Sequence, residues 1–162
     1  RRQRQLCIRD SPRAVVASLM VDKDQFWKKS GEESPFWDCR YDQEGYALWE
    51  QSGRMPAVLT ALQWVHMYKL AEKEVAGCDV GYTKVRYEDY VDAPKKTIGK
   101  IIEFCGLEKS RNVELWVSDV AYSSANRKFR EILDERQIEW IERIVGDQLD
   151  ELGYARVCGK GG

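Results

Sequence analysis

Residues 5–19, QLCIRDSPRAVVASL, join a short apolar run to a helix through a turn that contains an arginine. The apolar run at residues 6–8 predicts a buried strand. Ser11 followed by Pro12 is typical of a helix start, with the serine at the N-cap and the proline at the first helical position. The stretch therefore predicts a strand that leads directly into the N-terminus of a helix.

This turn is a candidate anion site. A helix N-terminus presents unpaired backbone N–H groups and the positive end of the helix dipole. Arg9 and Arg13 lie beside it, and a guanidinium group matches two oxygens of a phosphate or sulfate. Ser18, about two turns into the helix, can add a hydroxyl donor. A surface ion pair between Arg9 and Asp10 explains the same residues without a ligand, so both interpretations stay open.

The composition is that of a folded globular domain. The chain has 162 residues, of which 43% are hydrophobic and 33% charged, enough for one domain with a real core. Its net charge of −1 gives no support to nucleic-acid binding through an overall field. No apolar run approaches the length of a membrane span. The five cysteines lack C-x-x-C spacing, which favours reduced, structural cysteines and gives no sign of a metal site.

The rest of the chain predicts helices and one further strand. Apolar periodicity and helix-end signals predict helices at residues 12–29, 56–75, 94–105, 112–117 and 134–152, and a strand at residues 82–87 that feeds a loop. Residues 30–55 predict a long irregular segment rich in aromatic residues. That segment is either a substrate-facing lid or a surface insertion packed by its own rings.

Two strands, each followed by a helix, favour an α/β domain with a mostly parallel sheet. Ligands of such sheets bind beyond the carboxyl ends of the strands. Arg9 and Tyr87 both stand at a predicted strand end. We therefore expect them at the same edge of the sheet, where they form one candidate pocket.

Three blocks of this sequence resemble the C-terminal part of sulfotransferases that use 3′-phosphoadenosine 5′-phosphosulfate (PAPS). They are IRDSPRAVVASLM at residues 8–20, VRYEDYVDAPKKTIGKIIEFCGL at residues 85–107, and the tail at residues 126–154 that ends in ELGY. The resemblance implies an incomplete P-loop-NTPase-like domain, with few parallel strands, flanking helices and a helix-rich C-terminal half.

The resemblance also implies roles for individual residues. Arg9 and Ser18 would hold the 3′-phosphate of PAPS, and Tyr87 would lie by its adenine. Arg127 and Lys128 match the family's C-terminal basic pair, and no metal is implied. The family pattern has no counterpart of Ser11, which lengthens the turn between Arg9 and the helix but leaves Ser18 in register with the helix start.

The implied domain is a single partial sulfotransferase domain at residues 1–162. It divides into a 3′-phosphate-binding strand-turn-helix, the aromatic loop, a helix-strand-helix segment and C-terminal helices, at residues 1–29, 30–55, 56–107 and 108–162. The family's phosphosulfate-binding loop and its catalytic base, a histidine or glutamate, precede the first of these segments. We expect both upstream of residue 1, so the isolated chain is expected to be inactive.

The function implied is sulfuryl transfer from PAPS to a hydroxyl or amine acceptor. The acceptor class stays open between carbohydrate, peptide tyrosine, steroid and small phenol, and the compartment is either the cytoplasm or the Golgi lumen with an upstream anchor. Two other functions fit the residues: a non-catalytic nucleotide-binding module, or a helical interaction protein whose arginines are surface charge.

Overall fold

The computed structural model describes residues 4–21, 42–77, 79, 81–119 and 128–158. The chain divides into two compact units. The strand unit comprises residues 1–10 and 74–125, and the helical unit comprises residues 11–73 and 126–162. The stretch at residues 5–19 thus contributes its strand to one unit and its helix to the other.

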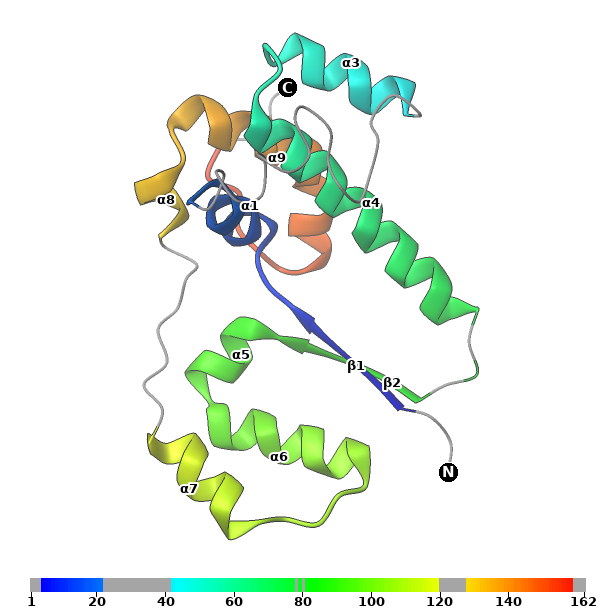
Figure 1. Ribbon diagram of the computed structural model, residues 1–162, viewed down its shortest axis with the longest axis vertical. Coiled ribbons are helices and arrows are strands. Elements are labelled where there is room, and N and C mark those ends of the chain that lie inside the picture. The colour runs from blue at the N-terminus through cyan, green and yellow to red at the C-terminus, as the bar shows by residue number, and fades with distance from the viewer. Residues whose placement is uncertain (1–3, 22–41, 78, 80, 120–127, 159–162) are drawn as a thin grey trace. The chain divides into compact units, whose positions relative to one another are not determined.

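The strand unit is built on a parallel pair of strands. β1 (Arg4–Arg9) and β2 (Gly81–Arg86) lie side by side (Figure 1), with Arg4 opposite Gly81 and Arg9 opposite Arg86. α5 (Tyr87–Asp92) packs against β2, and α6 (Pro94–Cys105) packs against both α5 and α7 (Arg111–Asp119). The prediction of a helix-rich α/β structure with parallel strands is confirmed.

α6 has the bounds that its sequence predicts. Pro94 stands at its first turn, where the missing N–H costs no helical hydrogen bond. Gly106 ends it in the left-handed conformation, with φ 64° and its N–H bonded to the last turn. Its apolar residues Ile98, Ile101 and Ile102 are half-buried.

The helical unit packs its helices around two apolar clusters. It contains α1 (Pro12–Val21), α3 (Gln43–Gln51), α4 (Pro56–Ala76) except its last three residues, α8 (Phe129–Ile132) and α9 (Glu135–Glu151). Its larger core joins α1, α4 and α9 through residues that include Val16, Ala57, Ile141, Val145 and Leu149, all fully buried. Burial of this apolar stripe holds α9 in place.

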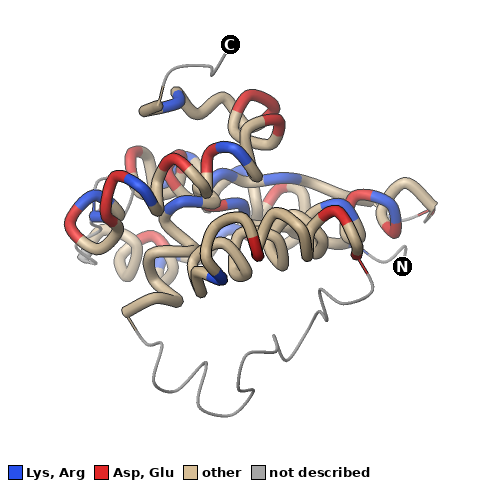
Figure 2. The backbone as a smooth tube through the Cα atoms, turned by 90° about the horizontal axis from the view of Figure 1, so that it is seen from above, with Lys and Arg blue, Asp and Glu red and all other residues tan. Residues whose placement is uncertain are grey.

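The N-terminus of α9 confirms the predicted helix start. The Asp134 side chain accepts a hydrogen bond from the backbone N–H of Gln137, and the Gln137 side chain accepts one from the backbone N–H of Asp134. This capping box satisfies two donors at the helix start. Lysines and arginines are interspersed with acidic residues along the helices (Figure 2), and the chain carries 26 basic and 27 acidic residues in all.

The expectation of an irregular segment throughout residues 30–55 is wrong, because α3 lies within it. The Asp42 side chain caps this helix by accepting from the Gly45 N–H at 3.0 Å. Trp49 is buried in a cluster with Val58 and Leu59 of α4. Trp49 is therefore a core residue and not part of a lid. Residues 30–41 of the predicted segment lie outside the described residues.

The predicted loop after the second strand is also wrong. Residues 87–92 form α5, which begins directly at the strand end. Glu88 and Asp89 stand in its first turn, where negative charge favours a helix N-terminus. The first helix is described as far as Val21, so its predicted extension to residue 29 lies outside the described residues. Cys7, Cys105 and Cys158 are free thiols, and Cys39 and Cys78 also lie outside that range.

Candidate functional site

The candidate site is the carboxyl edge of the strand pair, formed by Arg9, Arg86 and Tyr87. Arg9 and Arg86 are the last residues of β1 and β2 and stand opposite each other in the parallel register. Tyr87 follows Arg86 as the first residue of α5. The prediction that Arg9 and Tyr87 lie at one edge of the sheet is therefore confirmed, because the two strands are parallel neighbours.

Arg9 is held in place by the neighbouring strand. Its side chain is buried, with 6% of the residue exposed, and its Nη2 donates a hydrogen bond to the Tyr82 hydroxyl at 3.2 Å. A buried guanidinium interacts more strongly with an anion than an exposed one, because water screens the charge less. The edge thus presents a cation whose position is fixed by a side-chain contact.

Tyr82 remains protonated beside that cation. Burial raises the pKa of its hydroxyl, and the neighbouring Cys7 thiol raises it further, while the hydrogen bond from Arg9 acts in the opposite direction. Burial is the largest of these effects. A neutral Tyr82 therefore donates no negative charge to the edge, and its hydroxyl acts as a neutral hydrogen-bond acceptor for Arg9.

Aromatic rings lie at the same edge. Tyr87 is half-buried, and its ring centroid lies 6.4 Å from that of Tyr90, with the planes tilted by 44°. The aromatic faces suit contact with a flat ligand ring. Arg86 lies 3.8 Å from the Glu88 carboxylate, so part of the edge's positive charge is already matched.

The other predicted ligands belong to the helical unit. Ser18 lies on α1 and is exposed. Lys128 is exposed at the N-cap position of α8. Arg127 lies outside the described residues. Within one unit, the structure therefore brings together Arg9 and Tyr87, whereas the roles of Ser18, Arg127 and Lys128 stay predictions.

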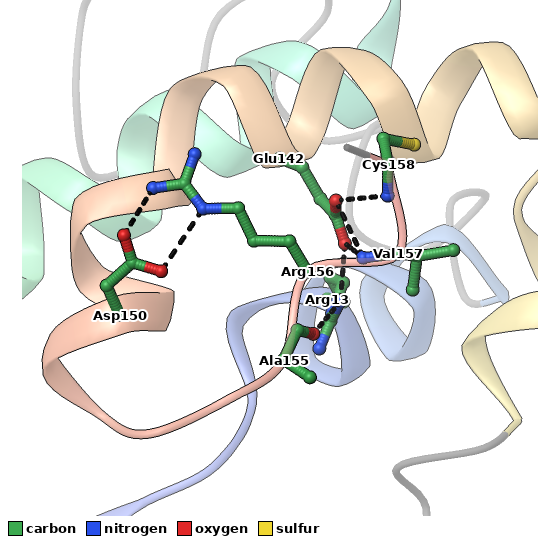
Figure 3. A network of polar contacts seen from close by, with 7 residues as sticks. All are labelled: Arg13, Glu142, Asp150, Ala155, Arg156, Val157 and Cys158. Carbon is green, nitrogen blue, oxygen red and sulfur yellow. Dashed lines mark hydrogen bonds and ion pairs between the residues drawn. The ribbon is translucent and has the colours of Figure 1, made fainter. Parts of the chain in front are cut away.

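Arg13, which the sequence places beside the anion site, is a structural residue. Its guanidinium pairs with the buried Glu142 carboxylate of α9 and donates to the Ala155 carbonyl at 3.0 Å (Figure 3). It also lies over the Phe129 ring, 4.9 Å from the centroid. Glu142 matches the charge of Arg13. The expectation that Arg13 adds positive charge to the anion site is therefore wrong.

Glu142 is the residue that the sequence interpretation missed. Only 3% of it is exposed, and its oxygens accept the backbone N–H of Val157 at 2.9 and 3.0 Å and that of Cys158 at 2.8 Å (Figure 3). Burial raises the pKa of the Cys158 thiol, and the Glu142 carboxylate raises it further. The sequence does contain a signal for the burial of Glu142. This residue stands at helical spacing from Ile138 and Val145 and thus on the apolar face of α9.

Two further properties concern the described residues only. The described residues contain no cluster of three histidine, cysteine, aspartate or glutamate side chains placed to hold a metal ion. None of the helices that they form is both long and apolar enough to span a membrane.

The carboxyl edge combines guanidinium groups with aromatic rings, a set suited to a phosphorylated ligand that carries a flat ring. Comparisons with protein-family models, curated proteins and solved structures found no match to this chain.

Proposed function

We propose that this chain is the part of a PAPS-dependent sulfotransferase that holds the 3′-phosphoadenosine end of the sulfuryl donor. The observation that carries the proposal is the parallel register of β1 and β2, which sets Arg9 opposite Arg86 and next to Tyr87 at one strand edge. Ligands of parallel sheets bind beyond this edge. The edge supplies both kinds of group that the nucleotide needs, a cationic fork and aromatic rings.

Arg9 is proposed to bind the 3′-phosphate. Its fork geometry fits two phosphate oxygens, and the Tyr82 hydroxyl restricts its orientation, so less side-chain freedom is lost on binding. Tyr87 is proposed to contact the adenine. The resemblance assigns Ser18 to the same phosphate and Arg127 and Lys128 to the basic pair, and these assignments are part of the proposal.

The chemistry proposed is transfer of a sulfuryl group to a hydroxyl or amine. Such a transfer depends on holding donor and acceptor in line and on stabilising charge at the leaving oxygen. This chain's own contribution is to fix the nucleotide end of PAPS, which determines where the sulfuryl group lies.

Calorimetry with 3′-phosphoadenosine 5′-phosphate tests the site on the 162-residue chain. We expect Arg9→Ala to weaken binding by about tenfold or more, because a hydrogen bond to a charged group contributes about 1.5–3 kcal/mol. Ser18→Ala should weaken it less. Arg143→Ala removes the same charge from an exposed site on α9 and should leave the affinity unchanged.

Adenosine 5′-phosphate, which lacks the 3′-phosphate, is the matched ligand control. It should bind more weakly, and its affinity should not depend on Arg9. Equal binding of the 3′-phosphorylated nucleotide by the wild type, Arg9→Ala and Ser18→Ala would refute the pocket. Complete absence of nucleotide binding would favour the helical interaction protein, and binding without transfer by the full-length protein would favour the non-catalytic module.

A further inference from the structure

A second candidate site lies in the strand unit, between α6 and α7. The two helices pack against each other and line a cavity of about 380 Å³, a volume typical of small-molecule sites. Its apolar lining comes from both helices and includes Ile98, Ile102, Val113, Leu115 and Val117. This cavity shares no residue with the proposed nucleotide site.

The charged part of the lining is mainly cationic. Lys95, Lys109 and Arg111 line the cavity together with a single carboxylate, Glu114. Lys95, Lys109 and Arg111 are exposed, and no ion pair involves them within the part of the chain that the structure describes. The lining therefore has an excess of positive charge beside an apolar surface.

We propose that this cavity binds a small anionic amphiphile, a molecule with an apolar body and one carboxylate, sulfate or sulfonate head. The apolar lining removes the body from water, which is the main favourable term for such a ligand. The three cations attract the head. A neutral apolar ligand leaves these charges unused, and a small inorganic anion leaves the apolar lining unused.

Gly99 provides a way to fill the cavity without disturbing the fold. It lines the cavity from the middle of α6, and a Cβ added there meets no atom within 4 Å. A larger side chain thus enters open space, and replacing a helical glycine also favours the helix. Gly99→Leu should occupy the ligand's volume while the protein stays folded.

Fluorescence titration with 8-anilinonaphthalene-1-sulfonate, an apolar sulfonate, tests the proposal. We expect saturable binding by the wild type and a loss of about tenfold or more in Gly99→Leu, because the added side chain takes the place of the aromatic body. Arg111→Glu should weaken binding by about fivefold, the effect of about 1 kcal/mol at an exposed charge. Lys96→Glu makes the same charge change on α6 outside the cavity and should have no effect.

The uncharged analogue N-phenyl-1-naphthylamine separates charge from apolar contact and should bind more weakly than the sulfonate. Wild-type affinity in Gly99→Leu would overturn the assignment to this cavity. Equal losses of affinity in Arg111→Glu and Lys96→Glu would contradict the proposal that the cavity's cations attract an anionic head group. Equal affinity of the wild type for the neutral analogue would contradict it too. Amide shifts at Gly99 and Ser118 on addition of the sulfonate, followed by NMR in the wild type, should locate the bound ligand between the two helices.

Discussion

Arg9 shows how a single side chain at a strand end acquires a fixed geometry. Its position follows from sequence alone, since it is the residue that separates an apolar run from a helix start. Its hydrogen bond to Tyr82 cannot be predicted from the sequence, because the two residues are 73 positions apart in the chain. The sequence thus predicts the charge at the edge, and the pairing of the strands determines how that charge is oriented.

The hydroxyl of Tyr82 gives this contact a pH dependence. Burial raises its pKa in the folded protein above the value of about 10 in the unfolded chain. The stabilisation that the protonated Tyr82 hydroxyl gives the folded state is complete below the unfolded-state pKa of about 10. It is lost as the pH rises through the folded-state pKa. The free energy of unfolding of the wild type should therefore fall more steeply above about pH 10 than that of Tyr82→Phe.

Urea unfolding of both proteins between about pH 8 and pH 11 measures this difference. Tyr46→Phe controls for general effects of alkaline pH, since the Tyr46 hydroxyl belongs to the helical unit and accepts its hydrogen bond from Arg54. Parallel pH profiles for the wild type and Tyr82→Phe would contradict the predicted linkage.

At the scale of single elements, local signals decide how well the sequence predicts the structure. α6 is predicted from end to end because Pro94 and Gly106 mark its two limits. α3 and α5 are missed for different reasons. α3 carries an internal glycine and depends on burial of Trp49 against α4, while α5 consists of residues that also suit a strand and a turn.

The C-terminal stop of α6 supports a stability prediction. Gly106 has φ 64°, which is unfavourable for a residue with a Cβ, and the added Cβ also approaches the Arg4 guanidinium. Gly106→Ala should lower the free energy of unfolding by about 1 kcal/mol. Gly99→Ala, in the interior of the same helix, should raise it by up to about 1 kcal/mol.

Denaturant unfolding followed by circular dichroism compares the two substitutions directly. They add the same methyl group to one helix, so a change of the same sign in both proteins would contradict the conformational argument.

At the scale of the whole molecule, residues distant in sequence determine what the sequence cannot predict. The prediction of an α/β, helix-rich chain with parallel strands is correct because hydrophobic periodicity is a local property. The pairing of Arg13 with Glu142 joins positions 129 residues apart. No local sequence pattern predicts that Arg13 is the partner of Glu142. A carboxylate within the apolar face of α9 indicates only that a cationic partner is needed.

This pair should contribute strongly to the stability of the helical unit. Glu142→Ala leaves Arg13 buried without its counter-charge, and it also removes the acceptor of two backbone N–H groups in the C-terminal tail. We expect a loss of about 3–5 kcal/mol in the free energy of unfolding. Glu50→Ala removes one partner of the exposed pair with Arg54 and should change the free energy of unfolding far less, because water screens that pair.

Urea unfolding of the three proteins measures both changes. The double variant Arg13→Met with Glu142→Leu should recover much of the loss, since an apolar pair leaves no unmatched charge in the core. Similar effects of Glu142→Ala and Glu50→Ala would contradict the structural role of the buried pair.

The burial of Arg13 has a consequence for any screen that removes the arginines of this turn one at a time. Arg9 and Arg13 are four residues apart, and alanine at either position is expected to reduce the nucleotide signal. At Arg9 the reduction would report a lost contact with phosphate, but at Arg13 it would report a smaller folded fraction. Such a screen would assign nucleotide contacts to two arginines where the proposal has one, unless the amount of folded protein is measured alongside each affinity.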